Sequence, residues 1–306
     1  MNKILGASPQ LTNILRTLPI IAVSDVSVLI YGEIGTGKGL LADILHAESR
    51  RNERPLITIN CAALQLEGIE IDLFGQCNDA GDIKHKGKLL AADGGTVFLD
   101  EVDALPLPIQ AKVLRFLEVG ECQLQGSHKL HKADVRILAA SSANLHEEVM
   151  AGRFRADLFY RLHVVPITMP ALRERGDDIG LLFRHFGREF DNNNAVVRYS
   201  RSVEHCLQSY SWPGNIRELM NFCQRMALLN PGKVIQLEDL PLEMMPEAAA
   251  NEHMFVLPPT GIKLAQVELD LIEQALEMAA GNRSKAARLL GISRDTLLYR
   301  MQKHDL

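Results

Sequence analysis

The sequence predicts an α/β domain built on a parallel sheet, a smaller helical unit after it, and a separate all-α domain at the C-terminus. Short apolar runs alternate with segments of helical period through the first half of the chain, and these runs stop after about Met169. Strands that alternate with helices are typical of a parallel sheet with crossover helices. The length of 306 residues, with 47% hydrophobic and 23% charged residues, suits a soluble globular chain of two domains, or of one large domain with an appendage.

Four runs are predicted to be buried strands, because they are short and almost continuously apolar. They are VLIY (28–31), LITI (56–59), TVFL (96–99) and VRILAAS (135–141). Later segments have helical period only, until one stretch loses periodicity and gathers Pro and Ala. We therefore expect an α/β subdomain over 1–169, a helical unit over 170–242, a linker over 243–262 and a second domain over 263–306.

Charge is unevenly distributed along the chain. The net charge is −5, but residues 281–306 carry six Lys or Arg against two Asp, so this tail has a charge of +4 and the remainder −9. A basic tail on an acidic body indicates an anionic partner such as DNA, although a solvated helix face would give the same pattern.

Membrane insertion and secretion are not predicted. The chain has no run of 18 apolar residues, and its N-terminus lacks the apolar core of a signal peptide. The five cysteines are scattered without a C-x-x-C pair, which suits reduced thiols and a cytoplasmic location. The combinations of Cys77 with His85, or of His128 with His131, do not have the spacing of metal-ligand pairs.

The segment LIYGEIGTGKGLLADIL (29–45) combines a strand, a glycine-rich turn and a helix. Its turn fits the pattern G-x-x-x-x-G-K, in which backbone N–H groups converge on a phosphate and the lysine adds positive charge. The next position usually carries a Ser or Thr hydroxyl that holds Mg²⁺, but here it is glycine. The residues expected to bind the nucleotide are Gly32, Glu33, Ile34, Gly35, Thr36, Gly37, Lys38 and Gly39.

A second element supports nucleotide chemistry. The segment GGTVFLDEVD places Asp100 and Glu101 at the end of a predicted strand. An acid at this position can hold Mg²⁺, and the adjacent carboxylate can polarise an attacking water as a general base. We expect Asp100 to be the Mg²⁺ ligand and Glu101 to be the base.

A series of further motifs runs along almost the whole chain. The motifs are LGASP, YGEIGTGKG, INCAAL, LFG, ADGGTVFLDEVD, QAKVLRFLE, VRILAAS, GRFRADLFYRL, PALRERGDDI and WPGNIREL. Their order resembles that in the AAA+ ATPases of the bacterial enhancer-binding proteins, the sigma-54-dependent transcription activators. The resemblance implies an AAA+ P-loop fold with 170–242 as the helical lid, ATP and Mg²⁺ as ligands, dimers that assemble to a hexamer-like ring, and RNA polymerase holoenzyme as partner.

The resemblance also implies roles for single residues. Asn60 of INCAAL is similar to the switch that holds or releases the catalytic Glu101. Arg155 and Arg161 are similar to arginine fingers, which reach a neighbouring subunit's nucleotide and stabilise charge on the transferring phosphoryl group. Arg217 is similar to the sensor arginine in the lid of the same subunit. Fingers supplied in trans require head-to-tail contacts that close into a ring.

The sequence departs from this family at three places. Between LFG and ADGGT the family carries a loop with G-A-F-T-G-A that engages sigma-54, whereas this chain has QCNDAGDIKHKGKLLA, so we expect it to act without sigma-54. The family also has Thr-Asn where this chain has Ser141 and Ser142, and usually Glu where it has Gly39. The Ser142 hydroxyl reaches less far than the Asn amide that senses the γ-phosphate. We therefore expect ATP binding with slow hydrolysis, and binding without hydrolysis is the alternative.

The stretch GNRSKAARLLGISRDTLLYRMQKH predicts a helix, a tight turn at Gly291 and a second helix. We expect Ser284 and Ser293 to cap the two helices. The residues expected on the inner, apolar face are Ala286, Ala287, Leu289, Leu290, Ile292, Leu297 and Leu298.

This stretch resembles the Fis-type helix-turn-helix, whose second helix enters the major groove. The residues expected to contact DNA are Ser284, Lys285, Arg294, Asp295, Thr296, Tyr299, Arg300 and Lys303. The preceding helix (264–280) is expected to form a dimer seam, which predicts a palindromic DNA site. The alternative is a helical hairpin that only docks on the body.

Two functional hypotheses remain open at this level. In the first, a DNA-bound ring uses ATP turnover to remodel a polymerase complex, which the intact acids and arginines favour. In the second, nucleotide occupancy sets the oligomeric state and DNA occupancy alone regulates the promoter, which the missing loop and Ser142 favour. The DNA-binding tail argues against a third hypothesis, an AAA+ machine acting on proteins. Because the chain starts directly at ILGASP, it is either a standalone regulator or a fragment of a longer one.

Overall fold

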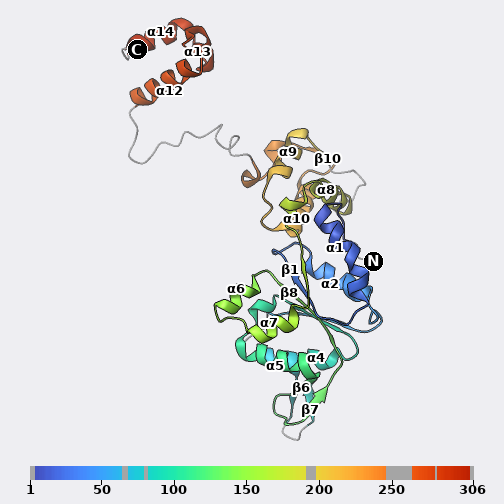
Figure 1. Ribbon diagram of the computed structural model, residues 1–306. Helices are drawn as coiled ribbons and strands as arrows, with labels where there is room; N and C mark the ends of the chain where they lie inside the picture. The colour runs from blue at the N-terminus through green and yellow to red at the C-terminus, as the bar shows by residue number, and fades with distance from the viewer. Residues whose placement is uncertain are drawn as a thin grey trace. The chain divides into compact units, whose positions relative to one another are not determined.

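The computed structural model describes residues 4–63, 68–78, 82–190, 198–245, 264–279 and 281–303, which form two compact units, 1–246 and 247–306 (Figure 1). The predicted linker over 243–262 lies largely outside the described residues. Among the helices of these described ranges, none combines the length and apolar character needed to cross a bilayer.

The first unit is built on a parallel sheet of five strands in the order β2-β5-β8-β1-β9. The strands are β1 (Val28–Tyr31), β2 (Leu56–Asn60), β5 (Thr96–Asp100), β8 (Arg136–Ser141) and β9 (Val165–Thr168). Because all strands run the same way, their carboxyl ends meet at one edge of the sheet, where ligands bind in open α/β folds. At this edge the glycine-rich turn follows β1, Asp100 and Glu101 stand at the end of β5, and Ser141 and Ser142 stand at the end of β8.

Helices cover both faces of the sheet. Along β1 and β5, Leu29 and Val97 face one core, whereas Ile30 and Phe98 face the other. The helices that contribute buried residues to the first core are α3 (Ile69–Phe74), α4 (Lys88–Ala91), α5 (Leu107–Val119), α6 (Leu145–Met150) and α7 (Ala156–Leu162). Those of the second core are α1 (Pro9–Ala22) and α2 (Lys38–Ala47). Burial on both faces explains why the central strands are continuous apolar runs in the sequence.

The four predicted strands are confirmed, but a fifth strand was missed and one expectation about the four is corrected. The fifth strand, β9, was not predicted, because Pro166 interrupts its pattern; proline is tolerated in edge strands, and β9 is at the sheet edge. The expectation that all four strands are buried is wrong for β2, the opposite edge strand, where Thr58 and Asn60 are exposed.

Two small hairpins extend from this unit. The first pairs β3 (Gln76–Cys77) with β4 (Ile83–His85), and the second pairs β6 (Glu121–Gln123) with β7 (Leu130–Lys132). The N–H of Cys77 donates to the carbonyl of Gln125 at 2.9 Å, and the N–H of Gln125 donates to the carbonyl of Gly75 at 3.0 Å, so the hairpins are tied together. Figure 1 shows β6 and β7 at the end of this unit opposite to the lid helices. The stretch QCNDAGDIKHKGKLLA (76–91) contributes β3, β4 and α4, with residues 79–81 outside the described part.

The lid has its own core, in which Trp212, Phe183 and Phe222 are almost fully buried. Its helices are α8 (Asp178–Glu189), α9 (Arg201–Ser209) and α10 (Asn215–Leu229), with short 3₁₀ turns at η2 (Leu172–Arg175), η3 (Leu237–Asp239) and η4 (Leu242–Met244). The expectation of an all-α unit is corrected by a parallel pair, β10 (Arg198–Tyr199) and β11 (Val234–Ile235). Strands of two residues are too short to leave a period in the sequence. Met244 belongs to the lid core, so this unit continues past residue 242.

The second unit contains α12 (Leu264–Met278), α13 (Arg283–Leu289) and α14 (Arg294–Lys303). Ala286, Ala287 and Leu297 are buried between these helices, as expected. Leu289 is not on the inner face, since it is 51% exposed.

One of the two predicted helix caps is wrong. The cap of α13 is Asn282, whose side-chain oxygen accepts from the N–H groups of Ser284 and Lys285, each at 3.1 Å. Ser284 therefore lies inside the first turn, because Asn282 already satisfies the free donors there. The cap of α14 is confirmed, since the Ser293 hydroxyl accepts from the N–H of Thr296 at 3.1 Å.

Candidate functional site

The glycine-rich turn lies between β1 and α2, with α2 beginning at Lys38. Gly35 and Gly37 adopt φ values of 81° and 98°, a region that only glycine enters without strain. The Lys38 amine folds back over the turn and donates to the carbonyls of Gly32 at 2.7 Å and Glu33 at 3.1 Å. This arrangement leaves a positively charged group and a helix N-terminus beside an anion-sized turn.

Three carboxylates at the edge of the sheet act electrostatically on Lys38. Burial lowers the pKa of Lys38, and the negative charges of Asp100, Glu101 and Asp103 oppose this shift. Asp100 ends β5, and its carboxylate accepts from the N–H of Glu101 at 3.1 Å. Glu101 has φ 54° and ψ 50°, a left-handed conformation that costs a non-glycine residue about 1 kcal/mol. The backbone thus holds Glu101 at an unusual angle at the edge of the sheet.

Asn60 ends β2 directly beside Asp100 in the strand register. Its side-chain oxygen accepts from the N–H of Ala63 at 2.9 Å. The predicted switch residue therefore lies next to the acid pair, with its amide oxygen engaged in a local turn.

The adjacent serines Ser141 and Ser142 have different environments. Ser141 is fully buried, and its hydroxyl donates to Asp103 at 2.7 Å. Ser142 is exposed and lines a hollow of about 550 Å³ together with Gly32 and Glu33. Ser142 therefore lies beside the turn, while the hydroxyl of Ser141 binds Asp103, an acid for which the sequence alone predicted no role.

Gly39 is not imposed by crowding. A Cβ atom at this position would meet Phe98 at 3.9 Å, which is an ordinary contact distance. The first turn of α2 therefore has room for a side chain that this chain does not carry.

The lid contacts the turn through residues that the sequence analysis did not single out. Arg173 pairs with Glu33 through N–O distances of 2.5 and 2.9 Å, and the Asn215 amide donates to Glu33 at 3.1 Å and to the carbonyl of Ile34 at 3.0 Å. These hydrogen bonds, first that of Arg173, lower the pKa of Glu33 to about 2. The N–H of Ile216 also donates to the carbonyl of Gly35 at 3.0 Å. Arg173 lies in the motif PALRERGDDI and Asn215 in WPGNIREL, but only the fold brings these two residues to the turn.

An apolar hollow of about 320 Å³ adjoins the turn on the lid side. Its lining residues include Ile4, Leu5, Thr36, Gly37, Leu40 and Met169. A buried ion pair between Arg175 and Asp178, at 3.0 Å, helps hold the N-terminal segment, because Arg175 donates to the carbonyl of Leu5 at 2.7 Å. The hollow is chemically suited to a flat base whose phosphates lie on the turn.

Arg217 lies at the turn as well, since its Cβ is 3.2 Å from where a Cβ of Gly35 would be. Arg155 and Arg161 are exposed and belong to a different region, around α7. Arg155 pairs with Asp157 at 2.7 Å, and Arg161 donates to the carbonyl of Leu117 at 2.8 Å. The structure therefore joins Arg217 to the nucleotide turn and places the two expected fingers on an open surface.

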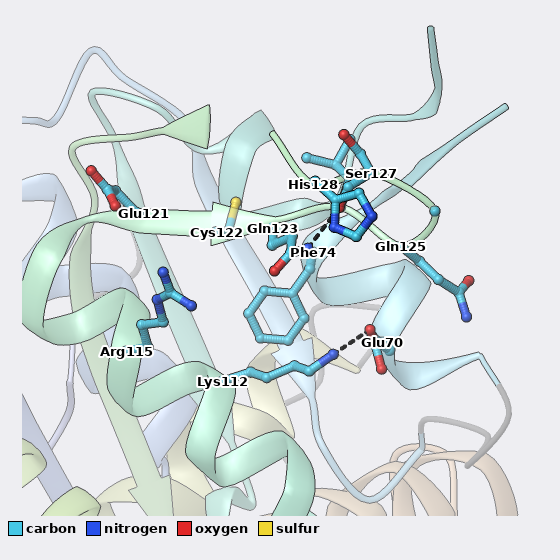
Figure 2. Close-up of a pocket in the computed structure, with 12 residues that line it drawn as sticks. Glu70, Phe74, Lys112, Arg115, Glu121, Cys122, Gln123, Gln125, Ser127 and His128 are labelled. Carbon is cyan, nitrogen blue, oxygen red and sulfur yellow. Dashed lines mark hydrogen bonds and ion pairs between the residues drawn. The ribbon is translucent and has the colours of Figure 1, made fainter. Parts of the chain in front are cut away.

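A separate pocket of about 410 Å³ lies between α3, α5 and the β6–β7 hairpin. Figure 2 shows Lys112 reaching toward Glu70, with which it forms an ion pair, and Arg115 of α5 on the side of Glu121. None of its lining residues belongs to the glycine-rich turn or the acid pair. We therefore distinguish it from the nucleotide site.

On the second unit, most expected DNA contacts are accessible. Arg294, Asp295, Tyr299 and Lys303 are exposed on α14. Lys285 is exposed on α13, whereas Ser284 on α13 and Thr296 on α14 are half-buried.

Arg300 differs from the expectation of an outward side chain. It is half-buried and forms an ion pair with Glu268 of α12. This pair links α14 to α12, so the guanidinium is already engaged within the unit.

Comparison with known proteins identifies three matching families. They are the Sigma-54 interaction domain over residues 4–168, the AAA+ ATPase lid domain over 173–255, and the Bacterial regulatory protein, Fis family, over 263–304.

Individual proteins match over the same length. The transcriptional regulatory protein ZraR of Salmonella typhimurium is 43% identical over 304 residues, which cover 98% of this chain and 68% of that protein. The regulatory protein AtoC of Escherichia coli is 39% identical over 313 residues, covering 99% and 68%. The crystal structure of NtrX from Brucella abortus in complex with ATP has a TM-score of 0.74 at 30% identity, covering 98% of this chain and 69% of that one.

The contact between turn and lid generates a first prediction. In Gly35→Ala, the new Cβ would lie 2.2 Å from the carbonyl oxygen of Gly214, so the lid must shift. We expect a loss of nucleotide affinity of at least about tenfold, measured with a fluorescent ATP analogue.

Gly152→Ala is the matched control, because Gly152 also has a positive φ, of 71°, but nothing lies near its Cβ. Both variants bear the same backbone strain, and only Gly35→Ala is expected to lose affinity. Equal affinities in the two variants would contradict the role of the lid contact.

Proposed function

The chain belongs to the family of bacterial transcription regulators that combine a Sigma-54 interaction domain, an AAA+ lid and a Fis-type DNA-binding domain, and we propose that it is a DNA-bound regulator whose AAA+ unit hydrolyses ATP slowly. The observation that carries this proposal is the set of charges at the carboxyl edge of the sheet. There the glycine-rich turn with Lys38 follows β1, and Asp100 and Glu101 stand at the end of β5 in the same parallel sheet, where their negative charges act on Lys38.

The proposed reaction assigns a task to each group. The turn and Lys38 bind the phosphates of ATP, while the apolar hollow takes the base. Glu101 polarises a water whose oxygen attacks the γ-phosphorus; the proton passes to Glu101, the bond to the β-phosphate oxygen breaks, and ADP and phosphate form. Arg217 adds positive charge from the lid of the same subunit.

The residues present fit Mg²⁺. Across the described residues there is no ready-made cage of three or more ligands. Mg²⁺ commonly uses one or two carboxylates together with phosphate oxygens and water, so Asp100 at the end of β5 is a sufficient protein ligand. When bound, Mg²⁺ would neutralise charge on the phosphates.

The exposed position of Arg155 and Arg161 supports a role between subunits. In a head-to-tail ring each subunit would present these arginines to the nucleotide of its neighbour, where a guanidinium can raise the rate by orders of magnitude. We propose dimers that assemble to a hexamer-like ring, because a single subunit cannot supply the arginines to itself in trans.

A second candidate function is a nucleotide-gated switch that binds ATP without hydrolysing it. It is favoured by Gly39, which supplies no side chain for Mg²⁺, and by Ser142, which stands where the family has Asn. In this case nucleotide occupancy would set the oligomeric state and thereby the occupancy of DNA.

ATP turnover per subunit, measured over a range of protein concentrations, separates these two functions. We expect slow turnover that rises with concentration as rings form, and that is lost in Glu101→Gln and in Arg155→Ala. Nucleotide binding without turnover at any concentration would instead establish the switch.

We also propose that the regulated polymerase is not the sigma-54 form, because QCNDAGDIKHKGKLLA stands in place of the G-A-F-T-G-A loop. The expected result is that a reporter fused to a regulated promoter keeps its response in a strain without sigma-54. Loss of the response there, but not of DNA binding, would refute this part of the proposal.

DNA is proposed to be bound at a palindromic site by a dimer formed through α12, with α14 in the major groove. Arg294→Ala is expected to weaken specific binding by about 1–3 kcal/mol if Arg294 reads a guanine. Arg300→Ala should affect binding less directly, because Arg300 is paired with Glu268.

Binding to operator and random duplexes, measured by fluorescence anisotropy, tests this assignment. Glu268→Ala serves as a comparison, since it removes the partner of Arg300 without removing Arg300 itself. An unchanged specificity ratio in Arg294→Ala would move that residue to the solvated face of α14.

A further inference from the structure

A buried glutamine connects the acid pair to the expected arginine fingers. Gln110 lies on α5 and is fully buried. Its amide nitrogen donates to the carbonyls of Leu105 at 2.7 Å and Arg153 at 3.1 Å, and its oxygen accepts from the N–H of Arg155 at 2.8 Å. A primary amide has two N–H donors and one carbonyl acceptor, so all three partners determine a single orientation of this side chain.

The three backbone groups belong to segments with different chemistry. Leu105 ends the short 3₁₀ turn (Val102–Ala104) that begins at Glu101. Arg153 and Arg155 lie in the loop before α7, and Arg155 is the residue at the start of that helix. The same amide therefore holds the turn after the proposed base and the loop that carries a proposed finger.

The finger depends on this backbone anchor. The guanidinium of Arg155 is exposed, and its partner Asp157 is exposed too, so that pair is worth little in water. The direction in which Arg155 leaves the surface is then set mainly by its buried N–H. The other expected finger, Arg161, is tied to α5, the helix of Gln110, because its guanidinium donates to the carbonyl of Leu117 near the end of that helix.

We propose that Gln110 is a positioning residue that couples the acid turn of one subunit to the arginines that this subunit presents to its neighbour. The inference rests on the proposed roles of Glu101 and Arg155. A displacement of the turn after Glu101, when the bound nucleotide changes, moves Leu105 and is carried by the rigid amide to Arg153 and Arg155. The state of one nucleotide site thereby reaches the next subunit.

Gln110→Met tests this coupling in the full chain. Met has a similar length but neither the two donors nor the acceptor. Gln208→Met, at an exposed position on α9, is the matched control. We expect Gln110→Met to bind a fluorescent ATP analogue like the wild type and to lose about 10- to 100-fold in turnover, as displaced catalytic groups do.

Mixed rings identify which site the substitution damages. Glu101→Gln subunits keep intact fingers, so they should restore turnover at Gln110→Met subunits; random mixing at equal ratio makes roughly a quarter of the interfaces competent. Subunits with both Arg155→Ala and Arg161→Ala have no fingers to give and should restore nothing. A purely structural defect in Gln110→Met would show no such difference between the two mixtures.

The opposite pattern, in which the finger-deficient subunits restore turnover and the Glu101→Gln subunits do not, would overturn the inference. Unchanged turnover in Gln110→Met would do the same. If the arginine double variant itself keeps wild-type turnover, the finger role proposed above fails, whatever Gln110 does.

Two further measurements cover a fold defect and an inactive wild type. Gln110→Asn, which keeps the two donors and the acceptor on a shorter side chain, replaces the Met variant if that variant shows no cooperative unfolding, and it should lose less turnover. ATP-dependent assembly, followed by sedimentation, provides a readout without hydrolysis. In this assay Gln110→Met should assemble to the same extent as Arg155→Ala. Assembly of Gln110→Met to the same extent as the wild type would overturn the inference.

Discussion

The close approach of the glycine-rich turn to the lid is the constraint on which the rest of the nucleotide site depends. Gly35 meets Gly214 so closely that no side chain fits, and the N–H of Ile216 donates to the carbonyl of Gly35. Asn215, fully buried and with φ 52°, satisfies polar groups on both sides of this contact. Because α10 begins at this point, the contact also fixes the position of Arg217 at the turn and brings Ile216 to the wall of the apolar hollow. A side chain at Gly35 would move all of these groups together.

Charged groups are also brought close together at the edge of the sheet. The buried ammonium of Lys38 experiences the charges of three carboxylates, and its hydrogen bonds are made to carbonyls of the turn itself. These bonds are weaker than those a charged amine makes with phosphate oxygens, so a bound nucleotide can replace them. The left-handed backbone at Glu101 is strained, and strain of this kind persists where the neighbouring structure over-determines the conformation. Here that neighbouring structure is the turn held by Gln110.

Much of this architecture could be predicted from the sequence, and the failures have physical causes. The four central strands were predictable because burial on both faces makes them continuously apolar, whereas β9 was hidden by Pro166 at an edge that tolerates it. The turn and the acid pair were predictable because their chemistry is local. Arg173, Asn215 and Gln110 were not, since each acts on groups that are 43 or more residues away in the chain. Even the cap of α13 depended on geometry, because Asn282 and Ser284 are both good capping residues and only the backbone decides between them.

On the proposed function, nucleotide binding and turnover would be separable in this chain, because different residues would determine them. Affinity depends on the turn, the apolar hollow and the lid, and these elements are intact and mutually hydrogen-bonded. The departures from the family, Gly39 and Ser142, lie at the phosphate end, where groups act on the transition state more than on the bound substrate. Weakening those groups lowers the rate without lowering affinity, so the chain can hold ATP for longer in each cycle. A regulator whose oligomeric state follows nucleotide occupancy would gain a longer-lived assembled state from this change. The arginines on α7, held through α5, would then report occupancy between subunits even when hydrolysis is slow.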